Sequence, residues 1–338
     1  MTSPETHPSL AEKVRPIGAG GHVVAAAFLG DCAIFATGEG EVLVAGASET
    51  RVKAHGGAIL AAASDGERIV TAGDNGRLIA VDRHGRSETL TEAPGKWIDH
   101  VALGPDGAFA WSVGRTAYAR TRKGEHKLDL PSTVGGLAFA PKGLRIAVAH
   151  YNGATLFYPN APEAKPELLD WKGSHLGVLF SPDGRFLITV MQEPALHGWR
   201  LADGQHMRMS GYPGRVRSIG FTADGKWLAT SGAREVILWP FQGKDGPMGK
   251  EPRMLAPGQG ETRVSAVACH PKQEIVAAGY SDGMVMLVRL ADGALVLARR
   301  AAGSPVSALA WRGDGQMLAF GSEDGQAGLL ALTYSSSA

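Results

Sequence analysis

One short pattern recurs along the chain and limits what it can fold into. Each copy has a short apolar run, a tight polar turn, a second apolar run, a glycine-containing turn and a third apolar run. Clear copies are Leu176–Val190 and Val216–Thr230. The first turns align on Asp31, Asp65, Asp106, Lys142, Asp183, Asp224, Lys272 and Asp314. Their spacing averages about 40 residues, so the chain is predicted to be an array of similar units.

The apolar runs are interpreted as strands. They are short and bounded by Pro-Asp-Gly, Asp-Asn-Gly or Ser-Asp-Gly, which are turn sequences. Glycine makes up 46 of 338 residues, about twice its usual share of ~7%. Because glycine adopts positive φ without a steric penalty, repeated tight turns account for this excess. The sequence therefore predicts an all-β fold.

A period of about 40 to 45 residues with about four short strands is typical of a β-propeller blade. The chain resembles the WD-repeat propeller family over residues 12–334, most clearly in the first hairpins Phe139–Gly143, Phe180–Gly184 and Phe221–Gly225. The family's terminal Trp-Asp is absent, and its Gly-His survives best at His55. We therefore identify a degenerate member. The positions of Trp-Asp are filled by Val81-Asp82, Trp199-Arg200, Trp239-Pro240 and Val288-Arg289.

The resemblance also concerns a hydrogen-bonded network that rigidifies many members of the family. The turn residues Asn75, Asp282 and Asp324 could take part in it, but no matching His accompanies them in the sequence. We therefore expect the network to be largely lost and apolar packing to hold the blades together.

Length sets the expected number of blades. About 327 residues divided by eight gives about 41 per blade, inside the usual range, whereas seven gives about 47. We expect a single eight-bladed β-propeller of four-stranded antiparallel blades over 12–334. Residues 12–18 should close the ring as the outer strand of the last blade, which removes exposed sheet edges. Residues 1–11 are expected to be a flexible tail, and 335–338 a second tail.

Composition excludes several classes of protein. The formal charge of +1 creates no field for polyanions, so neither nucleic acid nor an anionic membrane is an expected partner. Cys32 and Cys269 cannot form a disulfide framework or a cysteine zinc site. No apolar run is long enough to span a membrane, and Met1–Pro16 lacks an apolar signal core. We expect a cytoplasmic protein, and the Ala/Gly/Arg-rich composition favours a bacterial one.

Motifs that could carry catalysis have structural explanations. Gly279–Gly283 matches the Gly-x-Ser-x-Gly pattern, but strand-like runs flank it, so Ser281 is assigned to a hairpin turn instead of a nucleophile elbow. No pair of histidines has ligand spacing. His22, His100 and His175 lie near the starts of first strands and are weak metal candidates, for which local packing is the favoured explanation. We predict no catalytic residue, no metal and no cofactor.

Large and cationic side chains collect in the connections before the first strands and between the second and third strands. These connections emerge on one face of a propeller. Trp, Tyr and Arg there are typical of binding hot spots, although Trp97 and Trp171 could instead fill gaps between blades. The predicted partner-binding residues, over blades three to six, are Trp97, Tyr151, Trp171, His175, Tyr212, Arg215, Arg217 and Arg263.

Two functions remain open at this point. The favoured one is a non-enzymatic scaffold that binds a partner protein or peptide on this face, as the resemblance implies. Arg215 and Arg217 would pair with carboxylates, and the aromatic residues would supply apolar contact. The alternative is a metal- or small-molecule-dependent enzyme with a site at the mouth of the central channel.

Overall fold

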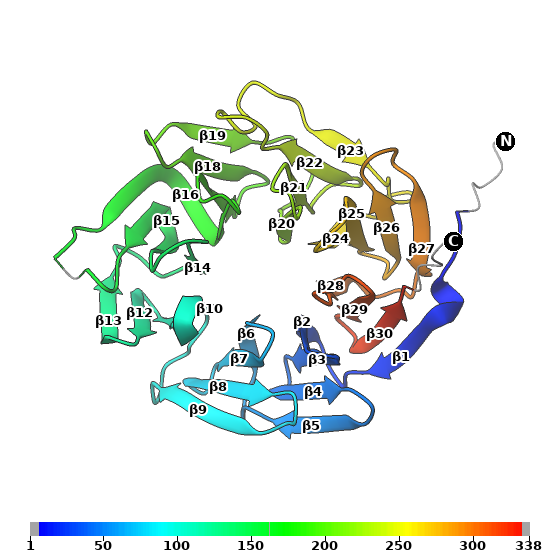
Figure 1. Cartoon of the computed structure of the whole chain (residues 1–338), viewed down its shortest axis with the longest axis horizontal. Coiled ribbons are helices and arrows are strands. Elements are labelled where there is room, and N and C mark those ends of the chain that lie inside the picture. Colours follow the sequence, from blue (N-terminus) through cyan, green and yellow to red (C-terminus); the bar gives the residue numbers. More distant parts are fainter. Residues whose placement is uncertain (1–6, 162, 333–338) are drawn as a thin grey trace.

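The computed structural model describes residues 7–161 and 163–332. Antiparallel sheets stand side by side around a central axis, with β2, β6, β10, β20, β24 and β28 innermost (Figure 1). The all-β propeller prediction is confirmed. In the described part of the chain, no helix has the length and apolar character needed to cross a membrane.

Six of the sheets contain four strands each, and within each sheet the strands lie side by side. The first two comprise β2 (Val23–Leu29), β3 (Cys32–Thr37), β4 (Glu41–Ala45), β5 (Glu49–Lys53), and β6 (Ile59–Ser64), β7 (Arg68–Gly73), β8 (Arg77–Asp82), β9 (Ser87–Glu92). The third comprises β10 (Val101–Leu103), β11 (Phe109–Val113), β12 (Thr116–Thr121) and β13 (Gly124–Asp129). Short 3₁₀ turns occur at η1 (Ala11–Lys13) and η2 (Pro105–Gly107).

Three four-stranded sheets complete the later part of the ring. They comprise β20 (Ile219–Phe221), β21 (Trp227–Thr230), β22 (Val236–Pro240), β23 (Arg253–Leu255), and β24 (Val264–Cys269), β25 (Ile275–Tyr280), β26 (Val285–Arg289), β27 (Leu295–Arg299). The last sheet comprises β28 (Val306–Trp311), β29 (Met317–Ser322), β30 (Gln326–Ala331) and β1 (Val14–Gly18).

The remaining sheet has six strands, in the order β14-β15-β16-β17-β18-β19. Two of its strands are long. β15 holds the second and third apolar runs of the fourth repeat, pairing with β14 near its start and with β16 from Tyr151 onward. Similarly, β16 pairs with β15 up to Ser174 and with β17 from His175 onward. The bounds are β14 (Gly136–Phe139), β15 (Ile146–Phe157), β16 (Glu167–Phe180), β17 (Phe186–Met191), β18 (Leu196–Arg200) and β19 (His206–Met209).

The expectation of eight separate four-stranded blades is therefore wrong. With each continuous sheet counted as one blade, the described chain has seven blades, because the fourth and fifth repeats join in the six-stranded sheet. The physical cause lies in the connection 171–174, which continues as strand instead of leaving as a loop. Ser174 pairs with Tyr151, and the Gly173 amide donates to Asn152 Oδ1 at 3.1 Å.

The N-terminal segment completes the last sheet. All five residues of β1 pair antiparallel with β30, so the two ends of the described chain meet at one sheet, the blue and red strands of Figure 1. Part of the expected flexible tail is also hydrogen bonded: the Leu10 amide donates to the Leu297 carbonyl, and the Leu297 amide donates to the Pro8 carbonyl. The rest of that tail, 1–6, and the expected tail 335–338 lie outside the described residues.

Apolar clusters between neighbouring sheets form the core. The interface of β2–β5 with β6–β9, for example, buries Ile34, Val42 and Ile69. An analogous cluster containing Leu156, Leu187 and Trp199 lies between the two halves of the six-stranded sheet. The two halves therefore pack face to face like separate sheets although their hydrogen bonding is continuous. Apolar packing thus repeats around the whole ring.

The expected loss of the polar network is corrected in the sheet β6–β9. His55 Nδ1 lies 2.9 Å from Asn75 Oδ1, and His55 Nε2 lies 2.8 Å from Thr71 Oγ1. Thr71 in turn donates to the Ile79 carbonyl at 3.2 Å. The His that completes the network with Asn75 is therefore present. It is His55, in the connection that precedes this sheet.

A variant of this network occurs in the sheet β20–β23, where Tyr212 takes the place of the His. Its hydroxyl lies 2.8 Å from Thr230 Oγ1 and accepts a hydrogen bond of 2.6 Å from Trp239 Nε1. Thr230 donates to the Ile237 carbonyl. Burial raises the pKa of Tyr212 to about 12, so this phenol stays protonated.

Candidate functional site

The candidate face is the side of the ring formed by connections between sheets and by turns between second and third strands. Hydrogen bonds tie these two kinds of segment together. For example, the Ala93 amide donates to the Gly76 carbonyl, and the Ala19 amide to the Gly325 carbonyl. Because each connection is fixed to a neighbouring turn, side chains on this face are presented from an ordered backbone.

Two predicted aromatic residues are exposed on the candidate face. Trp97, between β9 and β10, is 66% exposed, and Tyr151, at the bend of β15, is 58% exposed. Trp97 therefore does not fill a gap between sheets. Exposed rings of this size are the side chains expected at a contact surface.

The aromatic hollow is a depression of about 310 Å³ beside Tyr151. Trp171 forms part of its wall, and its ring stacks on buried His197 with 4.0 Å between centroids. Trp171 thus both packs inward and lines the hollow. The hollow is lined by Tyr151, Trp171, Lys172, Gly173, Met191, Glu193, Ala195 and Arg208.

His197 is the buried support of this wall. Its side chain is fully buried, and neither ring nitrogen has a hydrogen-bond partner among the described residues. Burial, followed by the nearby His206 and His175, lowers the pKa of His197 to about 3. A neutral ring between aromatic neighbours fits this environment.

The arginine hollow, about 250 Å³, lies on the same face over β20–β23, β24–β27 and β28–β30. It brings together the predicted residues Arg215, Arg217 and Arg263, all exposed. It therefore extends beyond the region over blades three to six. Its lining residues are Gly214, Arg215, Arg217, Ser231, Gly232, Arg263, Val264, Ser265, Ser281, Pro305 and Glu323.

The guanidinium groups of the arginine hollow have few internal partners. Arg215 Nη1 donates to Gln192 Oε1 at 3.0 Å, and Arg263 Nη1 makes a long 3.5 Å contact with the Pro213 carbonyl. Within 7–161 and 163–332, none of the three arginines forms an ion pair with a carboxylate. Most of their donor capacity is therefore free for a ligand.

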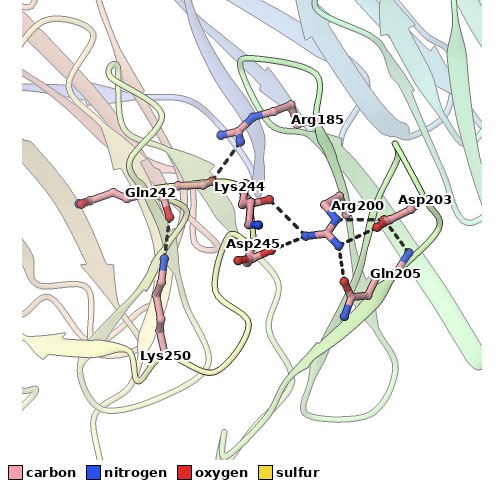
Figure 2. Close-up of polar contacts among 9 residues, drawn as sticks. Arg185, Arg200, Asp203, Gln205, Gln242, Lys244, Asp245 and Lys250 are labelled. Atoms are coloured by element: carbon pink, nitrogen blue, oxygen red, sulfur yellow. Dashed lines mark hydrogen bonds and ion pairs between the residues drawn. The ribbon is translucent and has the colours of Figure 1, made fainter.

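Arginines on the opposite face contrast with these. Arg200 binds Asp203 through Nε (2.9 Å) and Nη2 (2.6 Å), and its Nη1 lies 2.5 Å from Asp245 Oδ1 (Figure 2). Arg185 Nη1 donates to the Gly243 carbonyl at 3.0 Å. These bonds hold the connection 241–252 in place, and Asp245 in that connection supplies a negative charge opposite Arg200. That face also has a hollow, but the charge of Arg200 there is already neutralised.

Two of the predicted partner-binding residues, Tyr212 and His175, are buried and so do not form part of the exposed surface of the face. Tyr212 is 7% exposed and held in the network described above. His175 is 1% exposed, with Nδ1 at 2.7 Å from Thr189 Oγ1 and Nε2 at 2.9 Å from the Trp171 carbonyl. Both stabilise the candidate face from beneath instead of contacting a partner.

The three histidines considered for a metal do not come together. His22 is exposed, His175 is bonded as above, and His100 Nε2 donates to the Val134 carbonyl at 3.1 Å. Burial lowers the pKa of both His100 and His175. Among the residues that the structure describes, no cluster of three or more His, Cys, Asp or Glu side chains could hold a metal ion.

The sequence interpretation missed some residues of both hollows. Glu193 and Glu323 lie in turns between second and third strands, so the rule that selected Tyr151 would also have found them. Arg208 lies on the outer strand β19, where no sequence signal separates it from other exposed arginines.

Comparisons with known proteins agree with this architecture. A family model described as "WD domain, G-beta repeat" matches residues 205–240, and one described as "Anaphase-promoting complex subunit 4 WD40 domain" matches residues 267–336. WD repeat-containing protein 55 from Mus musculus and from Rattus norvegicus are each 23% identical over 216 residues, or 62% of this chain. The match spans only 54% of each relative's length.

Structural comparison gives the same fold. The computationally designed protein Ika8 superposes with a TM-score of 0.74 at 17% identity, covering 93% of this chain and 98% of the designed one. At this identity the likeness concerns the fold alone. Together with the repeat matches, it confirms the resemblance drawn from the hairpins and their spacing.

Proposed function

We propose that this WD-repeat protein is a non-enzymatic scaffold that binds a partner protein or peptide on the candidate face. WD-repeat propellers typically mediate protein interactions. The observation that carries the proposal is the gathering, on one face, of exposed Trp97 and Tyr151 with three arginines that lack carboxylate partners among the described residues. On the opposite face, Arg185 is paired with Asp183 and Arg200 with Asp245.

The partner's contact has two parts. Tyr151 and Trp171 at the aromatic hollow would bury apolar side chains of the partner, because rigid rings contribute area at a small entropic cost. Arg215, Arg217 and Arg263 would pair with acidic groups of the partner through their planar forks. The preformed backbone of the face limits the ordering cost of binding.

Affinity capture tests the proposal. The tagged protein is used to recover partners from a lysate of its host, and recovery is quantified by mass spectrometry. Tyr151→Ala and Arg217→Glu should each remove the same specific partner, since they alter separate hollows of one face.

Matched controls lie elsewhere on the surface. Met254→Ala removes a side chain that is 62% exposed on the outer strand β23, and Arg83→Glu reverses an exposed arginine between β8 and β9. Both controls should retain the partner. Unchanged recovery with Tyr151→Ala and Arg217→Glu would contradict the assignment of the face. The cytoplasmic location expected from the sequence stays a prediction, which fractionation of the host tests.

A further inference from the structure

We propose that the arginine hollow binds a phosphate monoester carried by a side chain of the partner segment. This inference rests on the proposed function and names the chemistry that the hollow recognises. It concerns Arg215, Arg217 and Arg263, which come from two connections that are distant in sequence and meet at one depression.

Charge balance favours a dianion over a single carboxylate. Three guanidinium groups against the one carboxylate of Glu323 leave two uncompensated positive charges at the hollow. A phosphorylated side chain carries a charge of about −1.5 to −2 and three acceptor oxygens. A carboxylate carries only one negative charge, so it leaves one of the two uncompensated positive charges unbalanced.

The backbones of two arginines are fixed before any ligand arrives. Ser231 Oγ accepts hydrogen bonds from the amides of Arg217 (3.1 Å) and Ser218 (3.0 Å). Ser281 Oγ accepts one from the Arg263 amide at 3.1 Å, while the Ser281 amide donates to the Arg263 carbonyl. The serine that matched a nucleophile pattern in the sequence thus holds an arginine in place.

A glycine makes room for one guanidinium group. A Cβ at Gly214 would lie 2.9 Å from Arg263 Nη1, closer than real side chains approach. An alanine at 214 would displace the end of the Arg263 side chain, which lies across the neighbouring connection near the Pro213 carbonyl.

The arginines of the hollow differ from those surface arginines that bind a neighbouring aspartate. Arg200, Arg289 and Arg312 each bind an aspartate two or three residues away in the sequence. Neither Arg217 nor Arg263 has such an aspartate in its own connection, 210–218 or 256–263. Glu261 lies two residues before Arg263, but it forms no ion pair with Arg263 among the described residues, so a ligand can supply the counter-charge of both arginines.

A polypeptide source fits better than a nucleic acid. The chain's formal charge of +1 provides no extended basic surface to follow a phosphate backbone. The nearby aromatic hollow offers Tyr151 and Trp171 to apolar side chains of the same segment. A single phosphate beside apolar residues is the pattern that these two hollows recognise together.

Fluorescence anisotropy with short labelled peptide pools tests the inference. The pools are randomised around a central phosphoserine, serine or glutamate. The wild-type chain should bind the phosphoserine pool at least about tenfold more tightly than the serine pool, and inorganic phosphate should compete. Arg217→Glu should remove this preference, whereas Arg83→Glu should keep it. Circular dichroism melting of each variant shows that the propeller is folded.

Several outcomes would overturn the inference. Equal affinity for the phosphoserine and serine pools, equal affinity for the phosphoserine and glutamate pools, or a preference that survives Arg217→Glu would do so. Stronger competition by single-stranded RNA than by the phosphopeptides would point to nucleic acid instead.

Capture from phosphatase-treated lysate separates this inference from the proposed function. Loss of the partner after phosphatase treatment supports the phosphate. A partner that is retained after treatment, yet still depends on Tyr151 and Arg217, overturns the phosphate and leaves the scaffold intact. Capture that is independent of both residues contradicts the scaffold proposal itself.

Discussion

Single buried polar residues fix the local structure beneath the candidate face. His55, His175 and Tyr212 each reach from a connection to a threonine hydroxyl on the second strand of a sheet. Leaving such a hydroxyl without its partner costs roughly 1–3 kcal/mol, because the buried group then has no hydrogen bond. These residues therefore attach the connections that carry the exposed side chains.

Tyr212→Phe should lower the free energy of unfolding by roughly 1–3 kcal/mol, since Trp239 Nε1 loses its acceptor and Thr230 loses a partner. Urea denaturation measures the change. Tyr151→Phe is the control and should stay within about 0.5 kcal/mol of the wild type, because its ring is exposed. Equal effects of the two substitutions would exclude the network as a source of stability.

Stability should fall as the pH is lowered from about 7 to 5. The folded-state pKa of His197 is about 3, far below the ordinary value of 6.5. Between these values the unfolded chain binds a proton that the folded chain does not, so stability is present above pH 6.5 and declines below it. His175 and His206, from β16 and β19, and Arg208 also face this ring and disfavour its charge.

His197→Phe should weaken this pH dependence, because Phe keeps the stack on Trp171 but binds no proton. The remainder comes from other buried histidines with lowered pKa values, such as His55 and His175. Thermal melting at several pH values measures the effect. His22→Phe, on the exposed surface, should leave the dependence as in the wild type. A dependence that is identical in the wild type and His197→Phe would show that His197 does not contribute to it.

At the scale of elements, the N-terminal strand β1 completes the last sheet. It adds the fourth strand to the last sheet and buries Ile17, which is 5% exposed in the cluster shared with β2–β5. Ile17→Ala should cost about 2–5 kcal/mol of unfolding free energy, and denaturant unfolding measures it. Arg15→Ala, on the exposed side of the same strand, should cost little. Comparable losses in both variants would contradict a packing role for β1.

The connection 241–252, which Arg200 holds in place, provides a second test at the scale of elements. Arg200→Ala removes the bonds to Asp203 and Asp245, so proteolysis within 241–252 should become faster. Arg289→Ala breaks the equivalent local pair with Asp292 but touches no long connection. It should leave proteolysis in 241–252 unchanged. Equal proteolysis of wild type and Arg200→Ala would show that other contacts hold the segment.

The sequence was informative about elements where turn chemistry and apolar alternation act locally. The Pro-Asp-Gly sequences correctly predicted hairpins such as the one at Phe180–Gly184, and the all-β fold class followed from those hairpins. The merger of two repeats could not be read from the sequence, because Trp171–Ser174 carries no marker of continued pairing. It depends on the contact of Ser174 with Tyr151 in three dimensions.

At the scale of the whole molecule, the geometry of the ring decides which side chains of a connection are exposed to solvent. The rule that connections share a face correctly located Trp97, Tyr151 and the three arginines on the candidate face. Burial was not predictable, because Tyr212 lies three residues from Arg215 of the hollow yet points into the core. The choice depends on Thr230 and Trp239, which are remote in sequence.

The central claim is that a partner binds the candidate face, and lysine cross-linking of the captured complex tests it most directly. Lys96 and Lys172 are exposed on that face, whereas Lys142 and Lys272 are exposed in turns between first and second strands on the opposite one. Mass spectrometry should find partner cross-links at Lys96 and Lys172 and few at the other pair. Cross-links concentrated at Lys142 and Lys272 would contradict the account.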